Sequence, residues 1–263
     1  MNELAGHTNS YHPYGLEEAL QGIAEAGYWY VELSAVPGWT EHVDLDAGVE
    51  QLRARLERYG LRPVSLSAHS DLTTADGLAH GVKAVRFAAD LGVPIVNTAI
   101  GGHWSEQEDE AAFLANIERL ADAAAEAGVV VALEIHGEIM ASGAKSRPLL
   151  ERIGREEIKV NYDTANCEFY GGVAAVDDLP AILPYVAHVH LKDKVGGPRV
   201  WNFPAPGDGH VDFRRVLELL TSAGYAGPYS VEVEFTGEPW PLVGEVTRSM
   251  RRAHEHLAGL GLR

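Results

Sequence analysis

The sequence is poor in cysteine and in basic residues, and both shortages restrict what the protein can be. Its single cysteine is Cys167, which excludes an intrachain disulfide and makes the reducing cytoplasm the expected location. Lysine and arginine number 21 against 38 aspartates and glutamates, and the net charge is −17. A surface of this sign repels phosphate backbones, so nucleic acid is not an expected partner.

Long hydrophobic runs are missing as well. No apolar stretch reaches the length of a membrane span, and residues 1–20 lack the basic start and apolar stretch of a signal peptide. No membrane partner is therefore expected. The 263 residues contain no linker or low-complexity segment, which predicts a single domain over residues 1–263.

Short runs rich in valine and isoleucine alternate with longer segments of helical period. The predicted strands cover residues 3–7, 29–34, 62–68, 94–99, 129–135, 158–163, 186–191 and 229–235. The predicted helices cover residues 15–26, 46–59, 75–91, 106–127, 146–153, 176–183, 211–223 and 241–258. A glycine follows many of these helices, as expected for a residue that ends a helix in the left-handed conformation.

Eight strands that alternate with eight helices predict an α/β fold, the closed (β/α)8 TIM barrel. The alternative is an open, doubly wound sheet. That fold often carries a glycine-rich phosphate loop after its first strand, and neither that motif nor a P-loop occurs here. The long segment 192–209, rich in glycine and proline, follows the seventh predicted strand and is interpreted as an active-site loop.

Polar side chains gather where nearly every predicted strand ends. The carboxyl ends of the strands form the active-site face of a barrel, so these side chains are expected to meet at one mouth. In chain order they are His7, Thr8, Asn9, Glu32, His69, Asp71, Asn97, His103, Glu134, His136, Asp163, Asn166, His188, His190, Lys192, Asp193, Glu232 and Glu234.

Several carboxylates at one buried mouth require a cation. The period of a strand places Glu134 and His136 on one face, and it does the same for Glu232 and Glu234. Burying such groups together without a positive charge is very costly. Carboxylate and imidazole ligands suit Mn²⁺, Mg²⁺, Co²⁺ or Zn²⁺. Any one residue has a simpler explanation, such as a helix cap at Asp163, but four strands together favour a metal site.

The chain resembles the xylose-isomerase-like barrels, a broad group of sugar isomerases and epimerases. The group includes ketose 3-epimerases, inosose isomerases and dehydratases, and endonuclease IV. The resemblance rests on the ordered segments "ALEIHGE", "NYDTANCEFYGG", "HVHLKDK", "PGDGHVDF" and "GPYSVEVEF". These segments cover the second half of the chain well, and the first half matches only in pattern.

The resemblance implies a metal held by Glu134, Asp163, His190 and Glu232, with Mn²⁺ as the expected ion. His190 is favoured over His188 as the second histidine of the pair, and Glu234 stays open as an alternative to Glu232. The two ligand glutamates, Glu134 and Glu232, would also serve as catalytic base and acid on opposite faces of a keto sugar. The implied reaction is isomerisation or epimerisation by proton transfer through an enediolate.

Other residues at the mouth are predicted to bind the substrate: His69, His136, Asn166, Lys192, Arg199 and Trp201. Two places depart from the ketose epimerases. Asn166 stands where many of them carry a histidine, and "LKDK" replaces the stretch that carries their substrate-binding arginine. The "HLKD" segment is closer to the inosose dehydratases, which leaves the exact reaction open.

Three other functions are alternatives to this reaction. A lyase would use the same metal and base but expel a β-hydroxyl or glycosyl group. Phosphodiester cleavage is disfavoured because Asn166 occupies the position of a required histidine and the net charge opposes DNA. A non-catalytic sugar-binding barrel would not need two opposed acids. Only Lys192, Lys194 and Arg199 lie near the mouth, which favours a neutral sugar, but phosphorylation and a homo-oligomeric state stay open.

Overall fold

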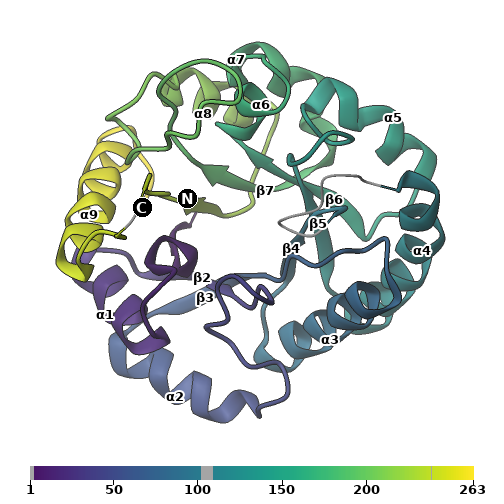
Figure 1. Ribbon diagram of the computed structural model, residues 1–263, viewed down its shortest axis with the longest axis horizontal. Coiled ribbons are helices and arrows are strands. Elements are labelled where there is room, and N and C mark those ends of the chain that lie inside the picture. Colours follow the sequence, from purple (N-terminus) through teal and green to yellow (C-terminus); the bar gives the residue numbers. More distant parts are fainter. Residues whose placement is uncertain (1–2, 102–108, 238) are drawn as a thin grey trace.

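The computed structural model describes residues 3–101, 109–237 and 239–263. Eight parallel strands form a closed barrel in sequence order, so each strand pairs with the next and β8 pairs with β1 (Figure 1). This confirms the predicted (β/α)8 barrel. The strands are β1 Leu4–His7, β2 Tyr30–Ser34, β3 Arg62–Ser67, β4 Ile95–Thr98, β5 Val130–Glu134, β6 Ile158–Asp163, β7 Val186–Leu191 and β8 Tyr229–Val231.

The helices form a ring around this barrel (Figure 1). They are α1 Leu16–Ala26, α2 Val49–Tyr59, α3 Ala75–Leu91, α4 Glu110–Ala127, α5 Gly143–Ile153, α6 Asn166–Phe169, α7 Ala175–Asp178, α8 Phe213–Ser222 and α9 Val243–Gly259. None of the described helices is both long and apolar enough to cross a membrane. The glycines predicted to end helices do so with positive φ, for example 66° at both Gly60 and Gly128.

Two predicted elements differ from the structure. The predicted helix 176–183 is replaced by α7 and two 3-10 turns, Leu179–Ala181 and Leu183–Tyr185. Each turn contains a proline, Pro180 or Pro184, which removes a backbone donor and prevents a longer α-helix. The predicted strand 229–235 leaves the barrel after Val231, and Glu234 then forms an isolated antiparallel bridge with Phe203 of the loop after β7.

The hydrophobic core lies between the barrel and its helices, whereas the inside of the barrel is polar. Alternation along β7 shows the reason, because Val189 and Leu191 belong to the core while His188 and His190 contact groups inside the barrel. Ser65, Asn161 and Ser230 surround His188 there, at 3.1, 2.9 and 3.1 Å. Burial lowers the pKa of His188 to about 3, so this histidine is a neutral part of the interior.

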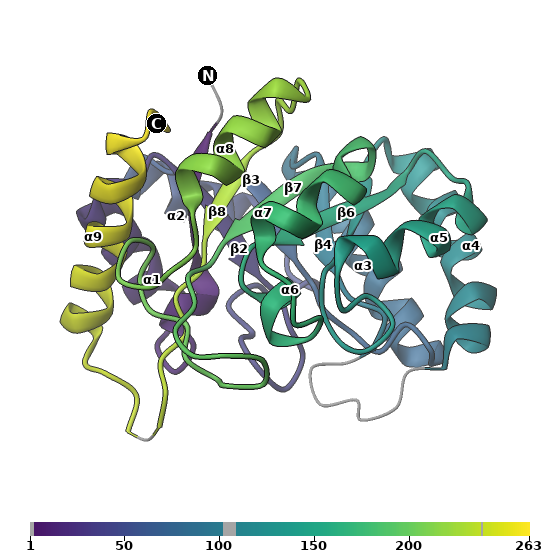
Figure 2. The same cartoon turned by 90° about the horizontal axis from the view of Figure 1, so that it is seen from above.

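The loops after β7 and β8 lie along the lower edge of the molecule in Figure 2, and the C-terminus lies at the opposite edge. The side chains at the ends of these strands therefore face the mouth that the sequence predicts as the active-site face.

Asp178 joins α5 to the barrel wall, and its loss is expected to destabilise the fold. Its buried carboxylate accepts hydrogen bonds from the backbone N–H groups of Gly143 and Ala144 and from the hydroxyl of Tyr162. Asp178→Ala leaves the two N–H groups without this acceptor and the Tyr162 hydroxyl with only the carbonyl oxygen of Ala175, at 3.4 Å, which should lower the free energy of unfolding by about 3 kcal/mol. Urea denaturation measures this free energy. The control is Asp177→Ala, which removes the exposed neighbouring carboxylate and should change the free energy of unfolding by about 0.5 kcal/mol or less. Equal losses in the two variants would contradict the assignment.

Candidate metal centre and active site

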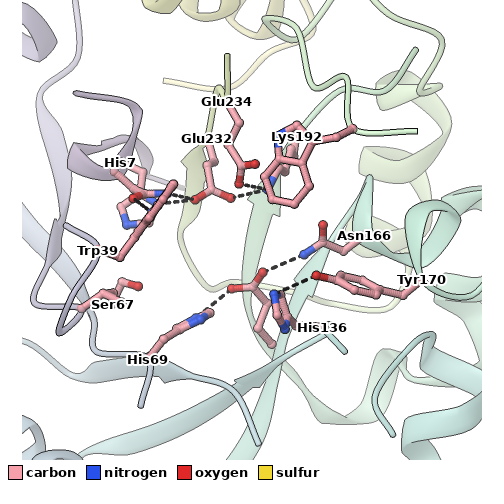
Figure 3. A pocket seen from close by; sticks show the side chains of 14 residues that line it. His7, Trp39, Ser67, His69, His136, Asn166, Tyr170, Lys192, Glu232 and Glu234 are labelled. Atoms are coloured by element: carbon pink, nitrogen blue, oxygen red, sulfur yellow. Dashed lines mark hydrogen bonds and ion pairs between the residues drawn. The ribbon is translucent and has the colours of Figure 1, made fainter. Parts of the chain in front are cut away.

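A pocket opens at the carboxyl ends of the strands, with about 460 Å³ of space including the part open to solvent. Seven of the predicted site residues line it: His69, Glu134, His136, Asn166, Lys192, Trp201 and Glu232. Figure 3 shows Glu232 between His7 and Lys192 on one side, with His69, His136 and Asn166 on the other. The pocket therefore has the convergent polar groups of a small-molecule site.

Four buried side chains, two of which line the pocket, form a candidate metal-ligand set. One ligand atom from each of Glu134, Asp163, His190 and Glu232 lies within 4.8 Å of the others, and all four residues are buried. They come from the ends of β5, β6 and β7 and from the residue after β8. These are the four residues that the resemblance implies, and the geometry is compatible with one shared cation; their role stays a prediction.

Two buried atoms in this set have no hydrogen-bond partner, namely Asp163 Oδ2 and His190 Nδ1. The other oxygen of Asp163 accepts the backbone N–H groups of Ala165 and Asn166, both at 2.8 Å, which fixes the carboxylate. His190 Nδ1 lies 3.5 Å from Glu134 Oε2 and 3.7 Å from Glu232 Oε2. A divalent cation between these atoms would satisfy both unpartnered groups, so the residues fit a metal.

The far side of the His190 ring is anchored across the barrel. Its Nε2 lies 3.0 Å from Glu32 Oε2, and Glu32 also accepts a hydrogen bond of 2.6 Å from Asn97 Nδ2. Glu32 is fully buried on β2. With Nε2 donating its hydrogen to this carboxylate, Nδ1 is the ring nitrogen that faces the three acids, and loss of its proton gives the tautomer that a metal needs.

Both proposed catalytic glutamates are held in the ionised form. Burial opposes ionisation of Glu134, but the charges of His69 and His190 outweigh it and lower its pKa to about 2. Burial also opposes ionisation of Glu232, and Lys192 and His7 lower its pKa well below the usual value. Two carboxylates in this state can accept protons from a bound substrate or bind a cation.

Two further acids at the mouth, Asp163 and Glu234, have raised pKa values. Burial raises the pKa of Asp163 to about 7, and it raises the pKa of Glu234 to about 7 as well. Lys192 forms ion pairs with Glu232 Oε2 at 3.0 Å and with Glu234. The site is thus crowded with negative charge that one lysine and the histidines only partly offset, and a divalent cation would offset the rest.

Each wall of the pocket holds its glutamate by hydrogen bonds. Glu134 accepts from Asn166 Nδ2 at 2.9 Å, and its other oxygen lies 3.0 Å from His69 Nε2. Glu232 accepts from Asn9 Nδ2 at 2.8 Å. Asn166, which departs from the family pattern, is therefore in direct contact with a proposed catalytic residue.

Two predicted substrate residues lie at the rim. Trp201 lines the pocket and packs edge to face against Phe169, with ring centroids 5.7 Å apart. Arg199 does not line the pocket; its guanidinium pairs with Glu138 and lies 5.3 Å from the ring centroid of Tyr170. Its role in substrate binding stays a prediction without a direct contact, and His103 lies outside the described residues.

Other pocket residues had no assigned role in the sequence interpretation. Trp39 comes from the loop after β2, donates from Nε1 to Asn9 at 2.9 Å and stacks on His12 with ring centroids 3.8 Å apart. Tyr170 lies 2.9 Å from His136 Nε2. The segment "NCEFYGG" that carries Tyr170 was a usable signal, whereas no pattern around Trp39 marks it.

These observations define a class, the closed (β/α)8 barrels in which three acids and one histidine that could hold a metal ion are buried together at the mouth. The family model described as xylose isomerase-like TIM barrel matches residues 20–257, and the chain belongs to this family.

Among the similar proteins is L-ribulose-5-phosphate 3-epimerase UlaE of Salmonella typhimurium, 28% identical over 233 residues, which cover 82% of this chain and 81% of that protein. The L-ribulose 3-epimerase of a Methylomonas species is 27% identical over 253 residues, covering 88% and 84%. A solved L-ribulose 3-epimerase aligns with a TM-score of 0.77 at 21% identity, covering 99% of this chain and 94% of that one. At this identity the solved structure supports the fold alone.

Proposed function

We propose that this protein is a divalent-metal-dependent enzyme that epimerises or isomerises a keto sugar by proton transfer through an enediolate. The observation that carries the proposal is that Glu134 and Glu232 both belong to the candidate ligand set and both line a single pocket. Glu134 contacts His69 and Asn166, which lie on the side of the pocket opposite Glu232 (Figure 3). The similar proteins named as ketose 3-epimerases support the same class of reaction.

In this reaction the cation and the side chains have separate roles. A bound cation, for which Mn²⁺ is our expectation, would polarise the carbonyl and acidify the neighbouring C–H bond. A carboxylate on the same face of the sugar as this C–H bond would then accept the proton. Glu134 can do this because its carboxylate is ionised. In an isomerisation the same carboxylate returns the proton to the adjacent carbon.

Epimerisation needs a second proton donor on the opposite face. We assign this role to Glu232, which must first take up a proton from solvent at the open mouth, because Lys192 Nζ, 3.0 Å from Glu232 Oε2, stabilises its ionised form. Glu232 would deliver that proton to carbon while Glu134 holds the one it removed, and proton exchange of both carboxylates with solvent would restore the starting state. His69, His136 and Asn166 would meanwhile hold the sugar hydroxyls.

The test is proton exchange at carbon. Purified protein would be incubated in D₂O with Mn²⁺ and a panel of ketoses and inososes, with EDTA in a parallel sample, and the products followed by NMR and mass spectrometry. We expect metal-dependent deuterium incorporation together with a new epimer or isomer. Loss of water or of a glycosyl group would instead establish a lyase that uses the same site. Exchange that survives EDTA would contradict the metal dependence.

A further inference from the structure

Lys194 is a buried cation enclosed by the loop that follows β7. Its ammonium group donates at 2.7–3.3 Å to a carbonyl cage, which consists of the backbone oxygens of Val195, Gly196, Gly197 and Val200. A buried charge must be satisfied by hydrogen bonds, and an ammonium group has three hydrogens to donate. The cage accepts all of them, so this lysine acts on the loop rather than on a ligand.

The chain that forms the cage is exposed and contains a strained residue. Residues 195–200 are all exposed, so burial does not fix their conformation. Arg199 has a φ of 62°, and a residue with a side chain keeps such a conformation only where its surroundings impose it. The carbonyl groups of Gly197 and Val200, on either side of Arg199, both accept from Lys194. The ammonium group therefore fastens the chain before and after its strained residue.

The second half of the same loop is held by a different side chain. The buried carboxylate of Asp193 accepts four backbone N–H groups at 2.8–3.0 Å, those of Lys194, Gly207, Gly209 and Val211. These hydrogen bonds do not involve the Lys194 ammonium group. Loss of that group should therefore loosen the first half of the loop and leave the second half attached.

The first half of the loop carries Trp201 to the pocket. Trp201 lines the pocket and directly follows Val200, whose carbonyl oxygen accepts the shortest of the four hydrogen bonds, at 2.7 Å. Its ring meets those of Phe169 and Phe203 edge to face, with centroids 5.7 and 5.3 Å apart. These contacts leave 42% of the side chain exposed, so the position of the indole depends on the backbone that carries it.

We propose that Lys194 is a positioning residue: by binding the carbonyl cage it holds Trp201 at the pocket, and it strengthens ketose binding through Trp201 without touching the sugar. The effect on ketose binding rests on the proposed function, whereas the position of Trp201 does not. The two lysines of the "LKDK" segment then have separate tasks, since Lys192 lines the pocket and pairs with its acids.

Acrylamide quenching of tryptophan fluorescence tests the positioning without any sugar. Lys194→Met keeps an apolar stem and removes the donors, and the signal of Trp201 is the difference from the matching variant with Trp201→Phe. We expect the quenching constant of Trp201 to rise about twofold. The control Lys83→Met removes an exposed lysine on α3 and should leave the constant unchanged. An unchanged constant in Lys194→Met would overturn the inference, because the aromatic contacts would then suffice.

Rescue by a small amine identifies the group that acts. Propylammonium reproduces the atoms that Lys194→Ala removes, and it should return the quenching constant of Trp201 to the wild-type value. Tetramethylammonium has the same charge but no N–H donor, so it should have no effect. Equal effects of the two cations would overturn the role of the cage. If neither Lys194 variant folds, the wild type decides: its Lys194 ammonium protons should exchange slowly with water by NMR, and fast exchange would overturn the cage.

Ketose binding tests the consequence for the pocket. L-ribulose, for which a similar protein is named, would be titrated into the Mn²⁺-loaded protein in a calorimeter. Lys194→Met and Trp201→Ala should each weaken binding by about fivefold, and the double variant should lose no more, because one residue acts through the other. Additive losses, or unchanged binding in Lys194→Met, would overturn the action through Trp201. Absence of binding by the wild type would count against the proposed function, and quenching would still decide the position of Trp201.

Discussion

Replacing Glu134 by glutamine is expected to lower kcat by about 10²–10⁴-fold, because the amide cannot accept a proton from carbon. The substitution preserves the shape of a side chain that is buried between Asn166 and His69. It also removes one proposed metal ligand, so the loss is to be measured at saturating Mn²⁺. Deuterium exchange at the substrate carbon, followed by NMR, separates the loss of proton abstraction from a loss of metal.

The mirror variant and a control make this result specific. If Glu232 only returns the proton, Glu232→Gln should still exchange deuterium on one face of the substrate while the new epimer no longer forms. Glu151→Gln is the control, since Glu151 is half exposed on α5 and pairs with Arg147 there; its kcat should be unchanged. Full activity in Glu134→Gln would remove Glu134 from the mechanism.

The barrel was predictable because its signal repeats. Eight apolar runs separated by helical segments mark the order of the elements, and a glycine such as Gly128 marks where a helix must end. Boundaries were less accurate where tertiary contacts decide them. The end of β8 is an example, because Glu234 pairs with Phe203, a residue 31 positions away that no local pattern connects to it.

The candidate site could be predicted where the two-residue period of a strand and the position of its end determine which side chains lie at the mouth. Glu134, Asp163 and His190 lie where the ends of β5, β6 and β7 put them. Partners across the barrel could not be predicted, since the contact between Glu32 and His190 joins residues 158 positions apart. Loop residues such as Trp39 were missed for the same reason, because their positions depend on the packing of the loop.

The choice between the two histidines of β7 illustrates what the sequence leaves open. His188 and His190 share a strand face, and the period of the strand cannot distinguish them. In the structure His188 is surrounded by Ser65, Asn161 and Ser230, while His190 Nδ1 is unpartnered and faces the acids. The two histidines are only two residues apart on one strand face, yet His188 is a neutral interior side chain and His190 is the proposed metal ligand.

Metal affinity is expected to rise steeply with pH, by about one to two powers of ten per unit between pH 5.5 and 8. Burial alone would lower the pKa of His190, but the charges of Glu32 and Glu134 raise it to about 10 in the metal-free protein. His190 is therefore protonated at neutral pH, and Asp163, with a pKa of about 7, is partly so. A cation must displace these protons, so its binding weakens as the pH falls.

The same two groups determine how stability responds. Both pKa values lie above those of the unfolded chain, near 6.5 for histidine and 3.9 for aspartate. The metal-free fold therefore binds more protons than the unfolded chain, so the stability that these two groups contribute is lost as the pH rises. For Asp163 the loss occurs between about pH 3.9 and 7, and for His190 between about pH 6.5 and 10. Mn²⁺ binding follows the opposite trend, so the rise in Tm on adding Mn²⁺ should be larger at pH 8 than at pH 6.

Calorimetry in buffers of different ionisation enthalpy counts the protons directly. About one to two should be released for each Mn²⁺ bound at pH 7, most of them from His190. His190→Asn should lose tight binding, whereas His210→Gln, which removes a half-exposed histidine paired with Glu168, should keep the wild-type proton count. Binding without proton release would mean that the cation does not use His190 Nδ1, and it would move the metal away from the four-residue set.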